Sequence, residues 1–263
     1  MADHLLVEKH GHIVTVTMNR PEARNAFSPE MMARLADAWD LIDGDDEVRV
    51  AILTGAGGHF SAGADLKLMA SGWTDEKWSP RFKADPDLHW KALLRHYRLK
   101  KPLIAAVEGT AIAGGTEILQ ATDIRVAAQG ARFGVAEARW GLFPLGGSTV
   151  RLRRQVPYTV AMDLLLTGRQ LTADEALRIG LVGRVVQNGQ ALIEAHTVAE
   201  QIAANGPLAV QAIKRSVMEG EGLTEREALE RELEIGWPIL STEDAKEGPR
   251  AFAEKRKPAF KGK

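Results

Sequence analysis

The stretch LIAAVEGTAIAGGTEIL, residues 103–119, decides the fold more than any other part of the chain. Its first five residues form a continuous apolar run, which is typical of a short strand that is covered on both faces. The segment Gly109–Gly115 then predicts a loop, and a helix is expected over Thr116–Thr122. This order of strand, glycine loop and helix leaves backbone N–H groups free at the junction between loop and helix.

A second unit of the same order precedes the first. Val48–Thr54 predicts a strand, Gly55–Gly63 contains four glycines and predicts a loop, and Leu66–Ala70 predicts a short helix. If N–H groups from the two loops converge on one oxygen, they form an oxyanion hole, and a helix N-terminus adds a positive dipole end. Taken alone, each loop is also compatible with a plain connection between elements.

Two glutamates accompany these units. Glu117 follows Gly114 by three residues in an apolar setting, and Glu137 follows a strand predicted at Ile124–Ala128 and opens another helical turn. Each of them alone also fits a helix cap or a first-turn acid that the helix dipole favours. If the fold brings them together, they form a carboxylate pair that can act as base and acid.

The rest of the chain is mixed at first and helical later. His12–Met18 predicts a strand, Ser28 caps a helix over Pro29–Leu41, and a further helix is expected over Leu88–Leu99, with an irregular segment before it. The change to helix falls near residues 157–167, without a linker-like stretch. Later elements are one strand at Val182–Val186 and helices over 158–166, 172–179, 190–204, 207–219, 223–235 and 241–256.

Composition narrows the classes of function. The chain has 263 residues, 45% of them hydrophobic, and 34 basic against 35 acidic residues, so it gives no electrostatic reason to expect nucleic acid or an anionic membrane. It has no cysteine, which excludes disulfides, thiolate nucleophiles and thiolate zinc sites. The sequence shows no signal-peptide pattern and no apolar run of about 18 residues, so we expect a cytoplasmic protein without membrane insertion.

Four common motifs are absent. The first glycine loop starts like a dinucleotide fingerprint but has Phe60 in place of the third glycine, and neither loop has the Gly-Lys-Ser/Thr of a phosphate-binding loop. Ser148 stands in Gly-Gly-Ser-Thr-Val and not in a nucleophile elbow. His10 and His12 have no further ligand residues near them in sequence, so no metal site is predicted.

An ordered series of motifs resembles the crotonase, or enoyl-CoA hydratase/isomerase, superfamily. The motifs span residues from about 12 to about 260, almost the whole chain. They are Asn19-Arg20-Pro21 with Asn25-Ala26; Thr54-Gly55 with Phe60–Leu66; Lys101-Pro102 with 105–109 and 114–117; Asp123; Phe133-Gly134 with Glu137, Gly141 and Pro144; Gly168-Arg169; Ala173, Ala176 and 180–182; and 246–248 with Phe252 and 254–256.

The resemblance implies an α/β fold, a spiral of ββα units followed by an α-helical C-terminal region that drives trimerisation. On this basis residues 1–200 form the core with the acyl-CoA site, and residues 201–263 form the oligomerisation region of a homotrimer or homohexamer. The helices of 207–256 carry more apolar residues than one small helical layer would bury, which agrees with an oligomer. Those residues are Leu208, Val210, Ile213, Val217, Leu229, Leu233, Ile235 and Trp237.

The resemblance also implies a reaction, the syn addition of water to a trans-2-enoyl-CoA to give a 3-hydroxyacyl-CoA. The thioester oxygen would lie between the N–H groups of Ala64 and Gly114. The hydratase pattern assigns water activation to Glu117 and the proton for Cα to Glu137, with no metal and no cofactor besides the CoA of the substrate. The alternatives are a Δ3,Δ2-enoyl-CoA isomerase or another crotonase chemistry, or a non-catalytic acyl-CoA-binding oligomer. The presence of both glutamates favours the hydratase.

The remaining site residues are implied for CoA and for the acyl group. Phe252 and Lys255 would contact the nucleotide part across subunits, although Lys255 also fits a solvated position in a charged run. Residues 66–97 and the segment 140–145 would wall a pocket for acyl groups longer than short chains, for example a sterol side chain. The aromatic residues there also fit an ordinary core or subunit contacts. The CoA residues are Arg24, Ala26, Ala62, Ala64, Leu66, Phe252 and Lys255, and the acyl residues are Leu68, Met69, Trp73, Trp140, Leu142, Phe143 and Leu145.

Three residues depart from the hydratase pattern. Leu145 follows Pro144, at a position where hydratases often have glycine. Thr116 replaces a small residue or cysteine, and Ala113 replaces a glycine. None of the three removes a catalytic group, so they bear on substrate and rate more than on the type of reaction.

Overall fold

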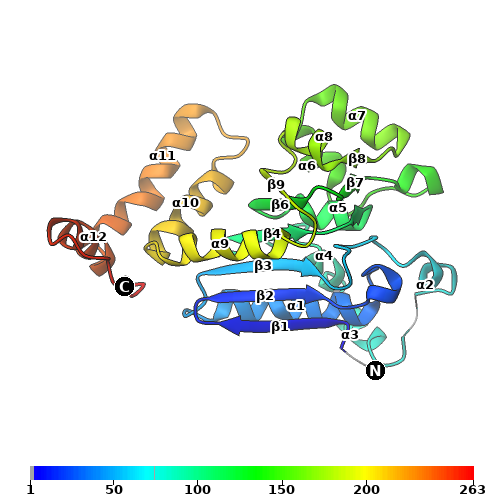
Figure 1. Cartoon of the computed structure of the whole chain (residues 1–263), viewed down its shortest axis with the longest axis horizontal. Helices are drawn as coiled ribbons and strands as arrows, with labels where there is room; N and C mark the ends of the chain where they lie inside the picture. The colour runs from blue at the N-terminus through cyan, green and yellow to red at the C-terminus, as the bar shows by residue number, and fades with distance from the viewer. Residues whose placement is uncertain (1–2, 74) are drawn as a thin grey trace.

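A six-stranded sheet forms the centre of the molecule (Figure 1). The structure is a computed structural model that describes residues 3–73 and 75–263. The outermost pair of strands at one edge is antiparallel, and the pairs that follow it are parallel. In spatial order the strands are β1 (Leu5–His10), β2 (Ile13–Met18), β3 (Val50–Gly55), β4 (Leu103–Val107), β6 (Ile124–Ala128) and β9 (Arg184–Val186).

The central strands are buried on both faces, as the apolar run of residues 103–107 predicts. Ile52 and Ile104 point to one face and pack with Val198 of α9 (Ala191–Ala203). Leu53 and Leu103 point to the other face and join the larger core, which includes the side chains of α1 (Pro29–Gly44). The sheet is therefore a layer between helices, and it forms a rigid base for the loops at its ends.

A smaller sheet makes the ββα units. It contains β5 (Thr110–Ile112), β7 (Arg132–Gly134) and β8 (Leu171–Thr172). The chain passes from β4 to β5 and on to α5 (Gly114–Leu119), and from β6 to β7 and on to the short 3-10 helix η2 (Glu137–Trp140). The unit that begins with β3 likewise reaches the small sheet through a bridge between Ser61 and Ala111 before α2 (Leu66–Ala70). This repetition is the predicted ββα spiral.

The other helices surround this core and extend from it. Those at the core are η1 (Pro21–Ala23), α3 (Ser79–Ala84), α4 (Leu88–Ala92), α6 (Ser148–Gln155), α7 (Tyr158–Thr167) and α8 (Ala173–Arg178). An arm of α10 (Pro207–Glu219), α11 (Glu225–Gly236), η3 (Trp237–Ser241) and α12 (Glu243–Ala253) lies at the left in Figure 1. The predicted boundary at residue 200 falls inside α9, and the arm begins after this helix. Within residues 3–73 and 75–263, no helix has the length and apolar character needed to cross a membrane.

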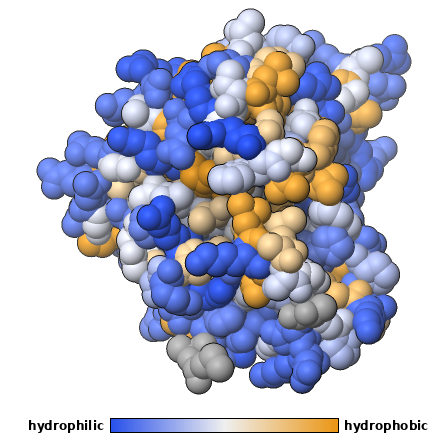
Figure 2. Space-filling view, turned by 90° about the vertical axis from the view of Figure 1, so that its right-hand side faces the viewer, coloured by the Kyte–Doolittle hydropathy of each residue, from blue (hydrophilic) through white to orange (hydrophobic). Residues whose placement is uncertain are grey.

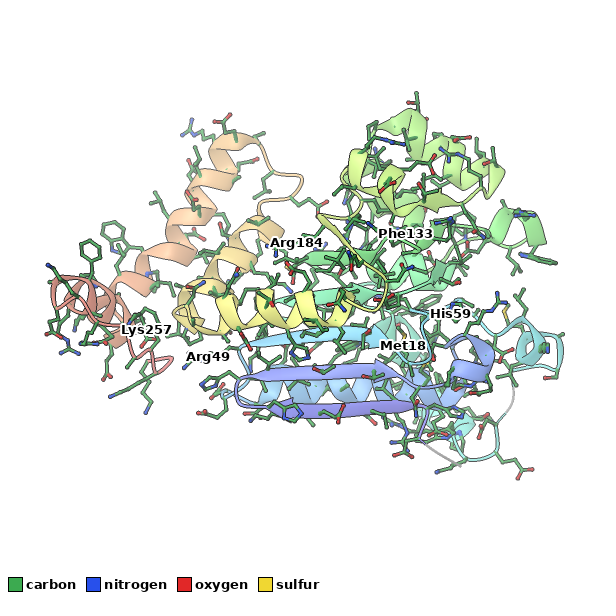
Figure 3. All side chains as sticks on the ribbon, in the orientation of Figure 1. Met18, Arg49, His59, Phe133, Arg184 and Lys257 are labelled. Atoms are coloured by element: carbon green, nitrogen blue, oxygen red, sulfur yellow. The ribbon has the colours of Figure 1, made fainter. Side chains whose placement is uncertain are left out.

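The last residues of the chain are bound to the arm and to the core. The Asp244 carboxylate accepts from the N–H groups of Lys261 and Gly262 at 2.7 and 2.8 Å, and Glu247 accepts from Ala259 N–H at 2.9 Å. Arg49, the residue before β3, donates to the carbonyl oxygen of Phe260 at 2.7 Å. Figure 3 shows Arg49 and Lys257 at this end of the molecule.

Several expectations about elements were wrong or incomplete. The helix predicted over Leu88–Leu99 ends at Ala92, because Leu94 has a positive φ of 52° and the Arg151 side chain binds the carbonyls of Leu94 and Arg95. The loop predicted over Gly109–Gly115 contains β5, and α12 is shorter than the helix predicted over 241–256. The strands β1 and β7 and the helices α3 and α6 were not predicted.

Candidate active site

The two glycine loops meet beside α5. Ser61 N–H donates to the Thr110 carbonyl at 2.8 Å, and Ile112 N–H donates back to the Ser61 carbonyl at 2.9 Å. Two residues later Gly63, at φ 82°, passes so close that a Cβ atom on it would lie 2.7 Å from the nitrogen of Gly114. Only glycine fits both this backbone conformation and this approach. The contact places the amide of Ala64 next to that of Gly114.

Both of these amides are available to a ligand. Gly114 opens α5, so its N–H has no partner within the helix. Among the described residues, neither Ala64 N–H nor Gly114 N–H has a hydrogen-bond acceptor. Ala113 lies at φ 52° and ψ −127°, a conformation that favours glycine, and its own N–H is taken by the Gly134 carbonyl at 2.7 Å. The structure thus brings together the two donors predicted for the oxyanion hole.

A buried asparagine supports the first loop. The Nδ2 group of Asn25 donates to the carbonyls of Ala56 and His59 at 2.9 and 2.7 Å, and its Oδ1 accepts from Arg20 N–H at 2.8 Å. The Ser61 hydroxyl donates to the Asn25 carbonyl at 2.8 Å. In Figure 3 His59 lies at the end of the sheet near Met18, on the side opposite the arm. The first motif of the chain is therefore a scaffold for the loop that presents Ala64.

Glu117 is held by the backbone that leads into α6. Its side chain is 4% exposed, and one carboxylate oxygen accepts from Ser148 N–H at 3.1 Å. The other oxygen lies against Gly146, where a Cβ atom would come within 2.6 Å of it. Burial raises the pKa of Glu117, while hydrogen bonds from the backbone of Ser148, Gly146 and Gly147 act in the opposite direction and favour the ionised form.

Glu137 shares the site with Glu117 but has fewer donors, since its own backbone N–H is the one group that favours its ionised form. It opens η2, is 9% exposed, and its Oε2 atom has no hydrogen-bond partner among the described residues. Burial, followed by the charge of Glu117, raises the pKa of Glu137 to about 7. The structure therefore brings the two predicted glutamates together. Burial raises the pKa of both, and the backbone donors near Glu117 counteract this effect.

Thr116 links the elements that carry the two glutamates. Its hydroxyl lies 2.5 Å from the Ala111 carbonyl and 3.0 Å from that of Gly134, and it accepts from Gly134 N–H at 3.1 Å. These bonds join α5 to β7, three residues before Glu137. Sequence analysis missed the supporting roles of Thr116, Gly146 and Ser148. The adjacent glycines 146 and 147 before a helix were the signal of a close backbone approach that could have pointed to the last two.

The residues predicted for CoA fall into two separate groups. Ala62 N–H donates to the Arg24 carbonyl at 2.9 Å, and Arg20 joins the Ala26 carbonyl to the carboxylate of Asp65, which precedes Leu66. This group borders the oxyanion donors. Phe252 and Lys255 lie at the end of α12, at the opposite end of the molecule from α2 (Figure 1). Within one chain they do not join the site.

The residues predicted for the acyl group lie on two segments that flank the site. One segment is α2 and the turn after it, with Leu68, Met69 and Trp73; Thr74, inside the predicted wall of 66–97, lies outside the described residues. The other segment follows η2, where Trp140 is 68% exposed and Phe143 is 63% exposed. Leu142 and Leu145 are also exposed, and the Leu145 carbonyl accepts from Arg95 Nε at 2.7 Å. Figure 2 shows apolar residues gathered in a strip on this face, with hydrophilic residues around it.

The described part of the chain offers no cluster of metal-ligating side chains. Within residues 3–73 and 75–263, no three His, Cys, Asp or Glu side chains lie close enough together to hold a metal ion. The chemistry that the site itself offers is that of a carboxylate pair beside two free amides.

Comparison with known proteins agrees with this geometry. A family model described as Enoyl-CoA hydratase/isomerase matches residues 8–263. Enoyl-CoA hydratase EchA19 of Mycobacterium tuberculosis is 56% identical over 263 residues, which cover 98% of this chain and 96% of that protein. (E)-benzylidenesuccinyl-CoA hydratase of Thauera aromatica is 39% identical over 258 residues, with 97% and 98% covered. Both relatives are named as hydratases, and hydratases are hydro-lyases.

A solved structure extends the comparison to the fold. The crystal structure of enoyl-CoA hydratase EchA1 from Mycobacterium marinum matches with a TM-score of 0.90 at 42% sequence identity, and the match covers 100% of both chains. The resemblance seen in the motifs and the ββα architecture are therefore confirmed, and the chain belongs to the enoyl-CoA hydratase/isomerase family of the crotonase superfamily.

Proposed function

We propose that this chain is an enoyl-CoA hydratase, which adds water across the 2,3 double bond of a trans-2-enoyl-CoA. The observation that carries the proposal is the pair of buried glutamates with opposite surroundings beside two free amides. Glu117 has a hydrogen-bond donor that favours a carboxylate, and Glu137 has a raised pKa that favours a neutral acid. The relative of 56% identity, which is named as an enoyl-CoA hydratase, supports the same reaction.

We infer the following course for the addition. The thioester oxygen accepts from the N–H groups of Ala64 and Gly114, which stabilise the charge that develops there as an enolate forms. Glu117 takes a proton from water while the water oxygen bonds to Cβ, and Glu137 gives its proton to Cα. The two new bonds form on one face, so the addition is syn. Transfer of the proton from Glu117 to Glu137 restores the starting state.

The expected sizes of these contributions can be ranked. One oxyanion donor is typically worth about 3–4 kcal/mol in the transition state. One acid or base group is worth roughly 10²–10⁴ in rate. Because these terms act only as the enolate forms, they raise kcat and not merely substrate affinity.

We propose that the acyl group extends beyond short chains. The exposed apolar residues of α2 and of the segment after η2 provide two walls that a bulky acyl group would cover. The relative from Thauera aromatica is named for an aromatic acyl-CoA, which shows that a similar chain serves a ring-bearing substrate. A sterol side chain is the bulkiest acyl group that we include in this proposal.

We also propose that the chain works as a homotrimer or homohexamer without a metal or redox cofactor. Ile213, Val217, Leu233 and Trp237 on the arm are all more than 60% exposed, so the arm presents an apolar surface that a second copy would cover. Phe252 and Lys255 would then reach the CoA of a neighbouring copy. Light scattering that finds a stable monomer at micromolar concentration would contradict the assembly, and loss of activity with a chelator would contradict the cofactor proposal.

The decisive experiment is a hydration assay that follows loss of the enoyl-thioester absorbance. The panel runs from crotonyl-CoA to ring-bearing and sterol-derived enoyl-CoA esters, and it includes a 3-enoyl-CoA. Hydration of 2-enoyl esters is expected. A chain that only moves the double bond of the 3-enoyl ester would be an isomerase, and one that binds the esters without turnover would be a non-catalytic oligomer.

A single substitution tests the proposal that the site accepts bulky acyl groups. Trp140→Ala should lower kcat/KM for the bulky esters more than for crotonyl-CoA, because it removes one wall of the groove. Tyr158→Ala is the control, since Tyr158 is a similarly exposed aromatic residue, 63% against 68%, on α7. A steep preference of the unmodified enzyme for the four-carbon ester would reject the large groove.

A further inference from the structure

A second cavity lies behind α5 and carries an excess of positive charge. Its volume is about 440 Å³, and it is enclosed by the segment 94–99, the end of α5, α6 and the end of α10. Two acidic side chains line it, Asp123, which pairs with Lys214 at 2.7 Å, and Glu221, which pairs with Arg154 at 2.9 Å. Five basic side chains also line it, so the cavity carries a net excess of three positive charges. The five are Arg95, Arg98, Arg151, Arg154 and Lys214.

Arg151 is the basic group most in need of a partner. Its Nη2 atom donates to the carbonyls of Leu94 and Arg95 at 2.5 and 2.8 Å. Its Nη1 atom is buried and has no hydrogen-bond partner among the described residues. Burial and the nearby charge of Arg98 lower the pKa of Arg151, which means that they disfavour its cationic form. The carboxylates of Glu117 and Glu221 act on Arg151 from nearby, but neither accepts a hydrogen bond from it. A buried N–H donor without an acceptor is costly, and an anion in the cavity would supply that acceptor.

The cavity is separated from the active site by one layer of backbone. A Cβ atom at Gly146 would lie 2.6 Å from the Glu117 carboxylate, whereas one at Gly147 would lie 3.3 Å from Nη1 of Arg151. The two adjacent glycines therefore have the catalytic carboxylate on one side and the unpartnered guanidinium on the other. Residue 147 lines the cavity, and residue 146 does not.

We propose that this cavity binds a small polyvalent oxyanion, such as phosphate or a short dicarboxylate. The guanidinium groups offer planar pairs of N–H donors that match the oxygens of such anions. Three surplus charges favour a polyvalent anion over chloride, and the volume lies in the range of small-molecule sites. This site is distinct from the groove that is proposed for the acyl-CoA.

Binding in the cavity has a consequence for Glu117, which rests on the proposed function. The charged groups that act on Glu117 are Glu137 from η2 and Arg151 from α6. An anion on Arg151 offsets its charge and opposes ionisation of Glu117. Because Glu117 must be ionised to accept a proton from water, the acidic limb of the kcat/KM profile moves to higher pH when the anion is bound.

Calorimetric titration of the intact protein tests the site without relying on catalysis. Phosphate and succinate are titrated separately against sodium chloride at equal ionic strength. Arg151→Gln should weaken binding at least tenfold, and Arg98→Gln, which alters a half-exposed residue with one ion pair to Glu221 at 3.6 Å, should weaken it severalfold. Arg153→Gln is the matched control, because Arg153 is exposed on the same helix and does not line the cavity.

The outcomes separate clearly. The site is supported if the affinity for both oxyanions is highest in the control, lower in Arg98→Gln and lowest in Arg151→Gln. The anion that binds more tightly identifies the type of ligand. Phosphate and succinate that bind no better than chloride, or that bind the two cavity variants as tightly as the control, would overturn it. Binding that leaves the acidic limb of kcat/KM unmoved would overturn the link to Glu117.

Discussion

Glu117 and Glu137 occupy the same site, and both side chains are almost fully buried, yet the backbone around them differs. The carboxylate of Glu117 faces the segment 146–148, where α6 begins and N–H groups point outward. Glu137 begins a single turn of 3-10 helix, and no described residue donates to its Oε2 atom. The comparison teaches that identical side chains at one site receive different hydrogen-bond surroundings: burial raises the pKa of both, and several backbone donors counteract this at Glu117.

The largest expected effects come from neutralising either glutamate. Glu117→Gln and Glu137→Gln should each lower kcat by roughly 10²–10⁴, because each removes one proton-transfer group without a change of size. Stopped-flow or steady-state hydration of the best ester measures this. Wild-type turnover in either variant would leave that residue as a helix cap and not a catalytic group.

The pH profile separates the two roles. Glu137 must be protonated to act as the acid, and its pKa is raised to about 7, so kcat/KM of the free enzyme should fall as pH rises through about 7. The Glu137→Gln variant should lose this alkaline limb, and Glu117→Gln should keep it at a lower pH, because it removes the negative charge that helps raise the pKa of Glu137. A limb that stays in place in the Glu137 variant would assign it to another group.

The next effect concerns the fit of Glu117 against its backbone. Gly146→Ala would place a methyl group 2.6 Å from the Glu117 carboxylate and force it to move. We expect kcat to fall by about 10–100-fold, since a misplacement near 1 Å costs about 10². Gly183→Ala is the control, because the nearest heavy atom to its new methyl group would be 3.9 Å away. Equal activity of the two variants would show that Glu117 is not held against Gly146.

The cost of burying Glu137 should appear in stability. A carboxyl group whose pKa rises on folding stabilises the fold fully below its unfolded pKa, near 4.5, and that stability is lost as pH rises through the folded pKa, about 7. Glu137→Gln should therefore be more stable than the wild type at pH 8 by roughly 3 kcal/mol and nearly equal to it at pH 4.5. Urea denaturation at the two pH values gives the difference, and the same gap at both would contradict the assignment.

The smallest expected effect comes from Thr116, which links the elements that carry the two glutamates. Thr116→Val keeps the shape but removes the hydroxyl that joins α5 to β7, so the free energy of unfolding should fall by about 1–2 kcal/mol. We expect less than a tenfold loss of kcat, because both glutamates keep their nearest neighbours. Thr116→Ser retains the hydroxyl and should restore most of the stability in thermal melts. A serine variant as unstable as the valine one would indicate that the methyl group matters instead.

The parts of the site that lie near each other in sequence were predictable. The two strand–loop–helix units show their glycines and apolar runs directly, so Ala64, Gly114 and Glu117 could be placed from the pattern and the family resemblance. The surroundings of Glu117 could not, because Ser148 N–H comes from 31 residues further along the chain. The helix expected over 88–99 ends early for the same reason, since Arg151 binds the Leu94 carbonyl across 57 residues. Periodicity records local preference, and it does not record such distant partners.

The residues that depart from the hydratase pattern also needed the structure. Thr116 fills its position with three hydrogen-bonding contacts, and Ala113 adopts a backbone conformation that usually belongs to glycine. Leu145 contributes its carbonyl oxygen to Arg95, and its side chain stays exposed. Phe252 and Lys255 lie apart from the site within one chain, so they would contact CoA only in the assembly that we propose.

The anchored segment 259–262 has a consequence for amide hydrogen exchange. The N–H groups of Lys261 and Gly262 are held by Asp244, and that of Ala259 is held by Glu247; both acids are only 7% exposed. Exchange of these amides with deuterated solvent must therefore wait until the segment detaches. Detachment also takes the Phe260 carbonyl away from Arg49. The three amides are therefore expected to exchange together and not one by one.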